Sequence, residues 1–293
     1  MPRFPLLSEV FKPVKVKPNV VRFDAPHVGI TKMAKRVFGG QLLGYAQISV
    51  EFLFPEFCVL SIRGNYVASG NTTLSLMVHV DRIAETQFVN VTLTQNDVVI
   101  TTAHVKIGTP DDIIASVSHP LPLSSSPSQC EDLIEVMKTL KGKSMPLFLK
   151  NTAKWGLFEM RPLSLNSLLP PKKLQPFTAW TTVTQTQRKL PYPPNSGRTV
   201  LTMMSDFWSM PAPMLNSEVL DKDNPNFPAS INHSVFFHTA EDLDPTGWYL
   251  FHTECHVNAS CRFLMTGNVF DQRGKCVISF EQEGFKATAK AKI

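Results

Sequence analysis

The chain has 293 residues, of which 43% are hydrophobic and 18% are charged, and its formal net charge is +5. This length allows two domains of ordinary size, and the hydrophobic fraction argues against a disordered protein. The mild positive charge favours an anionic ligand. Because the Lys and Arg residues form no stripe with interleaved aromatic residues, nucleic-acid binding is not predicted.

Cysteine usage and the ends of the chain bear on the compartment. The five cysteines form no CxxC pair and are odd in number, which favours a reducing compartment over a disulfide framework or a zinc site. No apolar run approaches the roughly 20 residues that cross a bilayer, and the first 17 residues do not resemble a secretory signal. The last residues, Ala291-Lys292-Ile293, are similar to the peroxisomal tripeptide Ser-Lys-Leu. They predict a peroxisomal protein, with the cytoplasm as the alternative.

The first strong pattern follows a short predicted strand at Val20–Phe23 and covers residues 37–50. Two glycines, Gly39 and Gly40, precede residues that are apolar on nearly every side of a helix, and such a helix is buried. The free N–H groups of a helix start can face a carbonyl oxygen or a phosphate. The alternative is that the glycines only allow close packing of the helix.

Alternating residues in both halves predict antiparallel strands. In the first half the strands are expected at 58–66, 74–80, 88–94 and 98–107. In the second half a strand at 177–186 precedes a helix at 198–208, and further strands are expected at 230–238, 248–256, 262–270 and 276–285. A helix followed by four strands thus occurs twice, which predicts an α+β fold. The predicted units are 1–110, a Pro/Ser-rich linker at 111–175, and 176–293.

One amphipathic helix is predicted within the linker. Ser128-Gln129-Cys130-Glu131 matches a capping box. The apolar residues that follow at helical spacing are Leu133, Ile134, Met137 and Leu140, and Gly142 is expected to end the helix.

Several short blocks, in order, resemble the acyl-CoA thioesterase II family over roughly residues 31 to 285. The blocks are Val37-Phe38-Gly39-Gly40-Gln41, Glu159-Met160-Arg161-Pro162, Ser205-Asp206-Phe207-Trp208, Ala229-Ser230-Ile231-Asn232-His233-Ser234 with Phe237-His238, and Gln282-Glu283-Gly284. The resemblance implies two fused hotdog domains, each a long buried helix wrapped by an antiparallel sheet. It also implies a thioester hydrolase of lipid metabolism that converts fatty acyl-CoA to free fatty acid and CoA, without a cofactor or a metal.

The resemblance also implies which side chains hold the attacking water. Asp206 and Gln282 match the family's Asp and Gln, and Ser230 stands where the family usually has Thr. A carboxylate can accept the proton of the water, and apolar neighbours that raise its pKa make it a better base. Because the first helix carries no acid before Glu51, one active site per chain is predicted.

The substrate is expected to meet a second group of residues. These candidate substrate-binding residues are Gly39, Gly40, Gln41 and His233. The basic residues Lys172, Lys173, Arg188, Lys189 and Arg198 either meet the CoA phosphates or form a solvated face. The sequence departs from the family at two positions, because Asn232 replaces an acidic residue and an Arg is missing near Asn90. These departures are expected to affect substrate preference, rate or subunit contacts.

The same residues leave other functions open besides hydrolysis. A non-catalytic acyl-CoA or fatty-acid binding protein is the runner-up, and enoyl hydration ranks lower because no His lies near Asp206 in sequence. The alternating His252, Glu254 and His256 suit cross-strand hydrogen bonds better than a metal site. Homo-oligomers are plausible, since such sheets have exposed edges.

Overall fold

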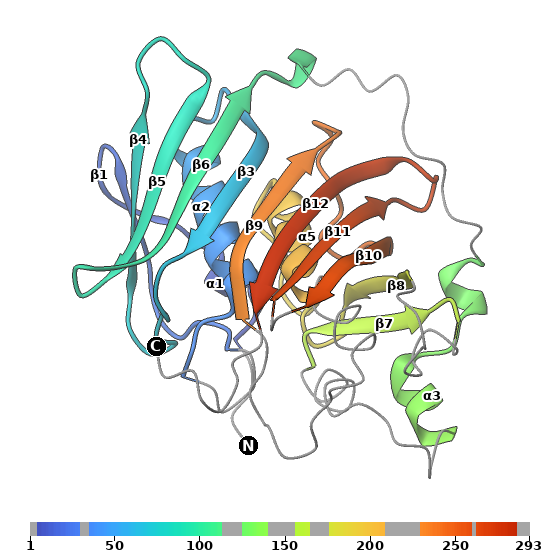
Figure 1. Ribbon diagram of the computed structural model, residues 1–293. Coiled ribbons are helices and arrows are strands. Elements are labelled where there is room, and N and C mark those ends of the chain that lie inside the picture. The colour runs from blue at the N-terminus through green and yellow to red at the C-terminus, as the bar shows by residue number, and fades with distance from the viewer. Residues whose placement is uncertain are drawn as a thin grey trace.

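The computed structural model describes residues 5–29, 35–112, 125–139, 156–164, 176–208, 229–259 and 262–285. In this part of the chain, twelve strands form one sheet in the order β1-β2-β4-β5-β6-β3-β9-β12-β11-β10-β8-β7. Every neighbouring pair is antiparallel, as predicted, and the sheet curves around two helices (Figure 1). The helices are α1 (Leu7–Val10), α2 (Gly39–Leu53), α3 (Leu133–Thr139) and α5 (Ser196–Trp208). The strands are β1 (Val14–Lys17), β2 (Val20–Phe23), β3 (Cys58–Tyr66), β4 (Leu76–Arg82), β5 (Phe88–Gln95), β6 (Val98–Gly108), β7 (Phe158–Pro162), β8 (Phe177–Val183), β9 (Ala229–Phe237), β10 (Tyr249–Ala259), β11 (Arg262–Phe270) and β12 (Cys276–Phe285).

The two halves of the sheet mirror each other about its centre. From edge to centre, β2-β4-β5-β6-β3 in the first half corresponds to β8-β10-β11-β12-β9 in the second. In each half two strands precede the central helix, β1 and β2 before α2 and β7 and β8 before α5, and four strands follow it. β3 and β9 join the halves through an antiparallel register that runs from Ser61 opposite Phe236 to Asn65 opposite Asn232. The antiparallel α+β organisation predicted from the sequence is therefore confirmed.

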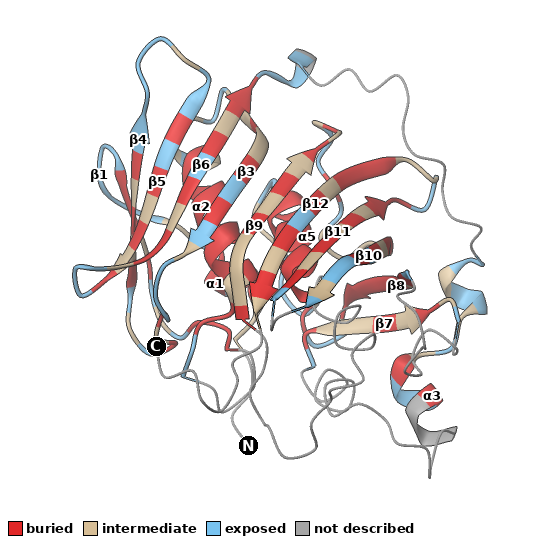
Figure 2. Cartoon of the chain, viewed as in Figure 1, coloured by how far each residue is buried: buried red, intermediate tan, exposed pale blue. Residues whose placement is uncertain are grey.

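The core lies between the sheet and the two helices α2 and α5. Figure 2 shows buried residues along both helices and alternating burial along the strands. All of α5 is buried, and α2 is buried from Gly40 to Val50. The helices run antiparallel against each other, since Gly40 contacts Met203 and Asp206 while Glu51 pairs with Arg198. Both helix starts are thus held inside the protein.

The linker differs from the prediction in one local feature. The capping box forms at Ser126, not at Ser128, and it caps the short turn Pro127–Gln129. Pro127 explains the shift, because proline is favoured in the first turn after a cap. The helix that follows, α3, begins at Leu133, and Asp132 accepts a hydrogen bond from the Ile134 N–H at 2.8 Å. Strand β7 also lies in the predicted linker, and the domain boundaries stay predictions.

Several predictions fall outside the described residues. They concern Leu140 and Gly142, the pair Lys172 and Lys173, and Ala291-Lys292-Ile293. Within the described ranges, no helix is long and apolar enough to cross a membrane. The described cysteines, Cys58, Cys130, Cys255 and Cys276, are all free thiols.

Candidate functional site

Asp206 lies near the end of α5 and is the centre of a hydrogen-bond cluster. Its Oδ1 accepts hydrogen bonds from the Ser230 hydroxyl at 2.8 Å and from the Gln282 amide at 2.7 Å. The same Gln282 amide also donates to the Ser230 hydroxyl. Asp206 is 2% exposed and Gln282 is fully buried. The three residues expected to hold the water therefore converge on one carboxylate.

The start of α2 supplies the third contact of this carboxylate. The Gly40 N–H donates to Asp206 Oδ2 at 2.7 Å. The residue before α2, Phe38, has no side chain that can cap the helix. Asp206 on α5 therefore takes the role of an N-cap residue for α2. It accepts a hydrogen bond from a backbone N–H that has no partner within the helix, at the positive end of the helix dipole. This contact ties the candidate base of one half to the glycine pair of the other.

A β-bulge brings Ser230 to this cluster. On β9 and β12, His233 pairs with Gln282, and their neighbours continue in simple alternation. The register then shifts between Glu283 and Gly284, so that Ser230 lies opposite Gly284. A bulge inserts one residue into one strand and reverses the alternation beyond it. Ser230, three residues from His233, can therefore share the interior side with Gln282.

Burial dominates the electrostatics of the site. Burial raises the pKa of Asp206, and the hydrogen bonds from Ser230, Gln282 and Gly40 lower it only in part. A carboxylate in this setting keeps more affinity for a proton than an exposed one. The direction agrees with the expectation from its apolar neighbours in the sequence.

The predicted substrate-binding residues take different positions. Gly39 faces the carboxylate, since a Cβ on it would stand 3.0 Å from Asp206 Oδ2. Gly40 gives its N–H to that carboxylate. The Gln41 side chain points to the preceding segment, where it accepts from the Val28 N–H and donates to the Tyr45 hydroxyl, both at 2.8 Å. Gln41 therefore orders the entry to α2 and does not join the cluster.

His233 is fully buried behind the cluster. Its Nε2 lies 2.7 Å from the Ser205 hydroxyl, whose proton goes to the Thr202 carbonyl oxygen at 2.8 Å. Burial lowers the pKa of His233 to about 3, so the imidazole is neutral near pH 7. We infer that it braces β9 against α5.

Asn232 stands where the family has an acidic residue, and it lies away from the cluster. Its side chain bonds to Glu283, with Asn232 Nδ2 donating to Oε2 at 3.0 Å. It also pairs with Asn65 across the junction of the halves. This departure therefore affects the junction and leaves Asp206, Ser230 and Gln282 in place.

Of the alternating residues of β10, the two histidines make cross-strand contacts, as predicted, whereas Glu254 contacts His252 on the same strand. His252 Nδ1 lies 2.7 Å from Thr178 Oγ1, and His256 Nε2 lies 2.6 Å from Thr266 Oγ1. Nowhere in the described ranges do three His, Cys, Asp or Glu side chains gather closely enough to hold a metal ion.

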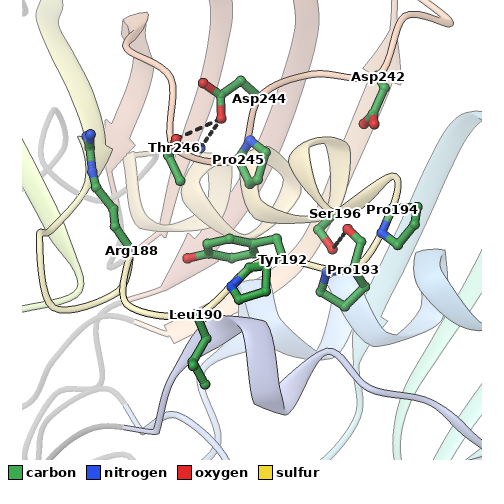
Figure 3. A pocket seen from close by; sticks show the side chains of 11 residues that line it. Arg188, Leu190, Tyr192, Pro193, Pro194, Ser196, Asp242, Asp244, Pro245 and Thr246 are labelled. Atoms are coloured by element: carbon green, nitrogen blue, oxygen red, sulfur yellow. Dashed lines mark hydrogen bonds between the residues drawn. The ribbon is translucent and has the colours of Figure 1, made fainter.

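An open pocket of about 460 Å³ lies at the other end of α5, around Ser196, Tyr192 and Asp242 (Figure 3). Ser196 and Asp206 are ten residues apart on α5, which is about 15 Å along the axis. The pocket is therefore separate from the Asp206 cluster. Arg188 lines it, but Arg198 does not reach solvent, because only 3% of that residue is exposed. The suggestion that Arg198 binds a CoA phosphate from a basic surface is wrong.

Tyr66 is the residue that sequence reasoning missed. It ends β3, and its ring packs against Gly39, beside the carboxylate of Asp206. No motif marks it, because a single tyrosine at a strand end has no sequence signal of its own.

An antiparallel sheet around buried helices is shared with proteins of the hotdog fold. The acyl-CoA thioesterase II TesB2 of Mycobacterium marinum superposes with a TM-score of 0.71 at 20% identity, covering 97% of this chain and 98% of that one. The tesB protein of Mycobacterium avium subspecies paratuberculosis gives 0.70 at 17% identity, covering 95% and 97%. A hotdog-fold protein of unknown function from Alicyclobacillus acidocaldarius gives 0.68 at 14%, covering 96% and 97%. At these identities the likeness establishes the fold.

The similarity to a protein family rests on the amino-acid sequence. The family model for acyl-CoA thioesterase matches residues 171–285, the stretch that holds Asp206, Ser230 and Gln282. The match bears out the resemblance and the enzyme class of thioester hydrolase for this part of the chain. No protein with a curated description matches the chain closely enough to be counted as a relative.

Proposed function

We propose that the protein hydrolyses fatty acyl-CoA to free fatty acid and CoA, with Asp206 as the general base. The observation that carries this proposal is the convergence of the Ser230 hydroxyl and the Gln282 amide on one oxygen of a buried carboxylate. Hydroxyl and amide groups beside a base can fix the orientation of a water, and such positioning supplies several kcal/mol of barrier reduction. The family match supports the same substrate class.

The proposed reaction needs no cofactor. Asp206 takes a proton from the water while the water oxygen bonds to the thioester carbonyl carbon, and the C=O electron pair moves onto the carbonyl oxygen. When the carbonyl re-forms, the C–S bond breaks and the sulfur leaves with the proton from Asp206. We assign the developing oxyanion to the N–H of Gly39, which is the first N–H of α2 and has no partner one turn earlier.

For the architecture, we infer two fused hotdog domains with one active site per chain. The mirrored strand order and the paired helices support the fusion. The single site follows from the contacts of the two buried acids, because Asp206 has neutral donors whereas Glu51 at the opposite end of the helix pair faces Arg198.

The test is thiol release by the purified protein from medium-chain and long-chain acyl-CoA. We expect turnover by the wild type and a loss of about 10²- to 10⁴-fold in kcat for Asp206→Ala, the range for a positioned acid or base. Full activity of Asp206→Ala would refute the role of this residue. Tight acyl-CoA binding by the wild type without thiol release would favour the non-catalytic binding protein instead.

A further inference from the structure

The hydroxyl of Tyr66 is an unexplained polar group beside the cluster. This oxygen is buried, and it has no hydrogen-bond partner among the described residues. Buried polar groups in folded proteins are almost always paired, and the exceptions call for an explanation such as a catalytic role or an unseen ligand. The rest of Tyr66 is partly exposed, so the side chain spans from the surface to the interior.

The ring of Tyr66 and the carboxylate of Asp206 flank the same glycine. A Cβ built on Gly39 would stand 3.1 Å from Tyr66 Cζ, the carbon that carries the hydroxyl, and 3.0 Å from Asp206 Oδ2. The side chain that glycine lacks would therefore fill the space between phenol and carboxylate. Three different elements, β3, α2 and α5, meet at this point.

The charge around Tyr66 keeps its proton in place. Burial raises the pKa of the phenol well above its usual value, and the neighbouring charge of Asp206 adds to this rise, while Arg36 opposes it. A protonated phenol donates one hydrogen bond. The Asp206 carboxylate already accepts hydrogen bonds from Ser230, Gln282 and Gly40, so the hydrogen bond of the Tyr66 hydroxyl is available for another acceptor.

We propose that the Tyr66 hydroxyl donates a hydrogen bond to the carbonyl oxygen of the bound thioester and strengthens it as that oxygen becomes an oxyanion. The proposal rests on the hydrolase function proposed above and adds a substrate-contacting residue to it. Tyr66 keeps its proton throughout, and the proton of the water still moves to Asp206 and then to the sulfur. A donor aimed at the developing charge acts mainly in the transition state, so its loss lowers kcat more than it changes KM.

The first test compares Tyr66→Phe with Tyr192→Phe. Both changes remove one buried phenol oxygen that has no partner in the described part of the chain, but Tyr192 lies at the remote pocket (Figure 3). We expect kcat of Tyr66→Phe to fall about 10²-fold while KM rises by no more than about tenfold, the loss expected for one neutral hydrogen bond, and Tyr192→Phe to match the wild type. Unchanged kcat in Tyr66→Phe, or a rise in KM alone, would overturn the proposal.

A second test reads the contact without turnover. Two acyl-CoA analogues are compared by calorimetry on wild type and Tyr66→Phe, a ketone in which CH₂ replaces sulfur and a thioether that lacks the carbonyl oxygen. We expect Tyr66→Phe to bind the ketone about tenfold more weakly and the thioether equally well, since a lost neutral hydrogen bond is worth about a factor of ten. Equal affinities of both proteins for the ketone would also count against the contact.

The two proposals fail in different ways. If Asp206→Ala is inactive while Tyr66→Phe is fully active, only the role of Tyr66 is wrong. If the wild type releases no thiol, the hydrolase function is wrong, and the ketone and thioether affinities still decide whether Tyr66 meets the carbonyl oxygen.

Discussion

One carboxylate is buried at each end of the α2–α5 helix pair, and the two carboxylates have different hydrogen-bond and charge partners. At one end Asp206 accepts three hydrogen bonds from neutral donors. At the other end Glu51 Oε1 lies 3.6 Å from Arg198 Nη1, and its Oε2 has no partner in the described part of the chain. Eleven residues separate Gly40 from Glu51, about 16 Å along the helix. The ends are therefore independent sites within one core.

This difference explains why a carboxylate alone does not make a site. Burial raises the pKa of both acids. The group that lowers the pKa of Glu51 most is the cation Arg198, whereas at Asp206 the groups that lower the pKa most are the uncharged donors Ser230 and Gln282. Arg198 is itself fixed, since it donates to the Val59 carbonyl oxygen and its guanidinium lies 4.2 Å from the centre of the Phe237 ring. We infer that Glu51 is structural.

The largest effect is expected from removing the cation at the structural end. Arg198→Met leaves Glu51 buried without a charged partner, because its other donors, Gln47 Nε2 and the Val59 N–H, are neutral. Removing one partner of a buried pair costs about 3–5 kcal/mol. We expect the free energy of unfolding, measured in urea, to fall by this amount. The kcat per folded molecule should stay near the wild-type value, because Asp206 is remote.

The double variant Glu51→Leu/Arg198→Met is the matched control. Replacing both charges by apolar side chains removes the uncompensated carboxylate, so most of the lost stability should return. If the single and double variants are equally unstable, the ion pair does not explain the cost. If the double variant loses turnover, the two ends are coupled and the comparison above is wrong.

The next effect concerns Gly40, the glycine whose N–H contacts Asp206. A Cβ on Gly40 would stand 2.5 Å from the Met203 carbonyl oxygen, which is backbone and cannot rotate away. Gly40→Ala must therefore push α2 from α5, which costs about 1–3 kcal/mol as overpacking. The shift also lengthens the Gly40 N–H···Asp206 bond, so kcat should fall as well. Thermal unfolding and thiol release measure the two effects.

Gly44→Ala is the control on the same helix. Its Cβ would meet only side chains, Thr199 Cγ2 at 3.1 Å and Phe11 Cε1 at 3.2 Å. These can adjust by a few tenths of an ångström, and alanine gains about 1 kcal/mol of helix propensity over glycine. We expect near-neutral stability and unchanged kcat. Similar losses in both variants would show that any added methyl on α2 disturbs the protein.

A smaller effect is expected at Ser230, whose hydroxyl has no counterpart in the contacts of Glu51. Ser230→Ala removes one donor to Asp206, and a hydrogen bond of this kind is worth about 1 kcal/mol, or more when its acceptor is charged. We expect kcat to fall about tenfold or more. Ser230→Thr keeps the hydroxyl and should stay close to the wild type. Equal losses in both variants would point to steric disturbance.

The sequence predicted the elements but not all of their contacts. Alternation and turn residues located β11 and β12 at the observed bounds, because a strand with one buried face has a period of two. The start of α5 was placed two residues late, at Arg198, because Ser196 and Gly197 are weak helix formers. Their position is set by packing, since a Cβ on Gly197 would collide with the Leu243 carbonyl oxygen. Tertiary contacts of this kind leave no local pattern.

The site shows the same division. Asp206, Ser230 and Gln282 were identified through the resemblance to the thioesterase family. The residue pattern alone could not identify them, because strand alternation favours opposite sides for Ser230 and His233. The bulge at Glu283/Gly284 reverses this alternation, and its position depends on the partner strand. Tyr66 and Arg198 were missed or misplaced for a related reason, since a lone tyrosine or a helical arginine has the same sequence appearance at the surface and in the core.

A further expected effect is a pH dependence of stability, in which His233 and the two buried acids act in opposite directions. The pKa of His233 is about 3 in the folded protein and about 6.5 when exposed, so the unfolded chain binds an extra proton between these values. Stability from this group is complete above pH 6.5 and is lost as pH falls toward 3, by at most about 1.4 kcal/mol per unit. Asp206 and Glu51 act oppositely, because raised pKa values make the folded state bind protons more readily as pH falls.

His233→Gln should therefore flatten the decline of stability between pH 6.5 and 4, measured by urea unfolding at several pH values. The wild type loses stability through His233 in this range, and the variant retains only the opposing trend of the buried acids and the contribution of other groups. His104→Gln, on an exposed part of β6, controls for the loss of an imidazole. A variant that follows the wild-type slope would show that His233 takes up protons in the folded state, which would remove the neutral brace from behind the Asp206 end.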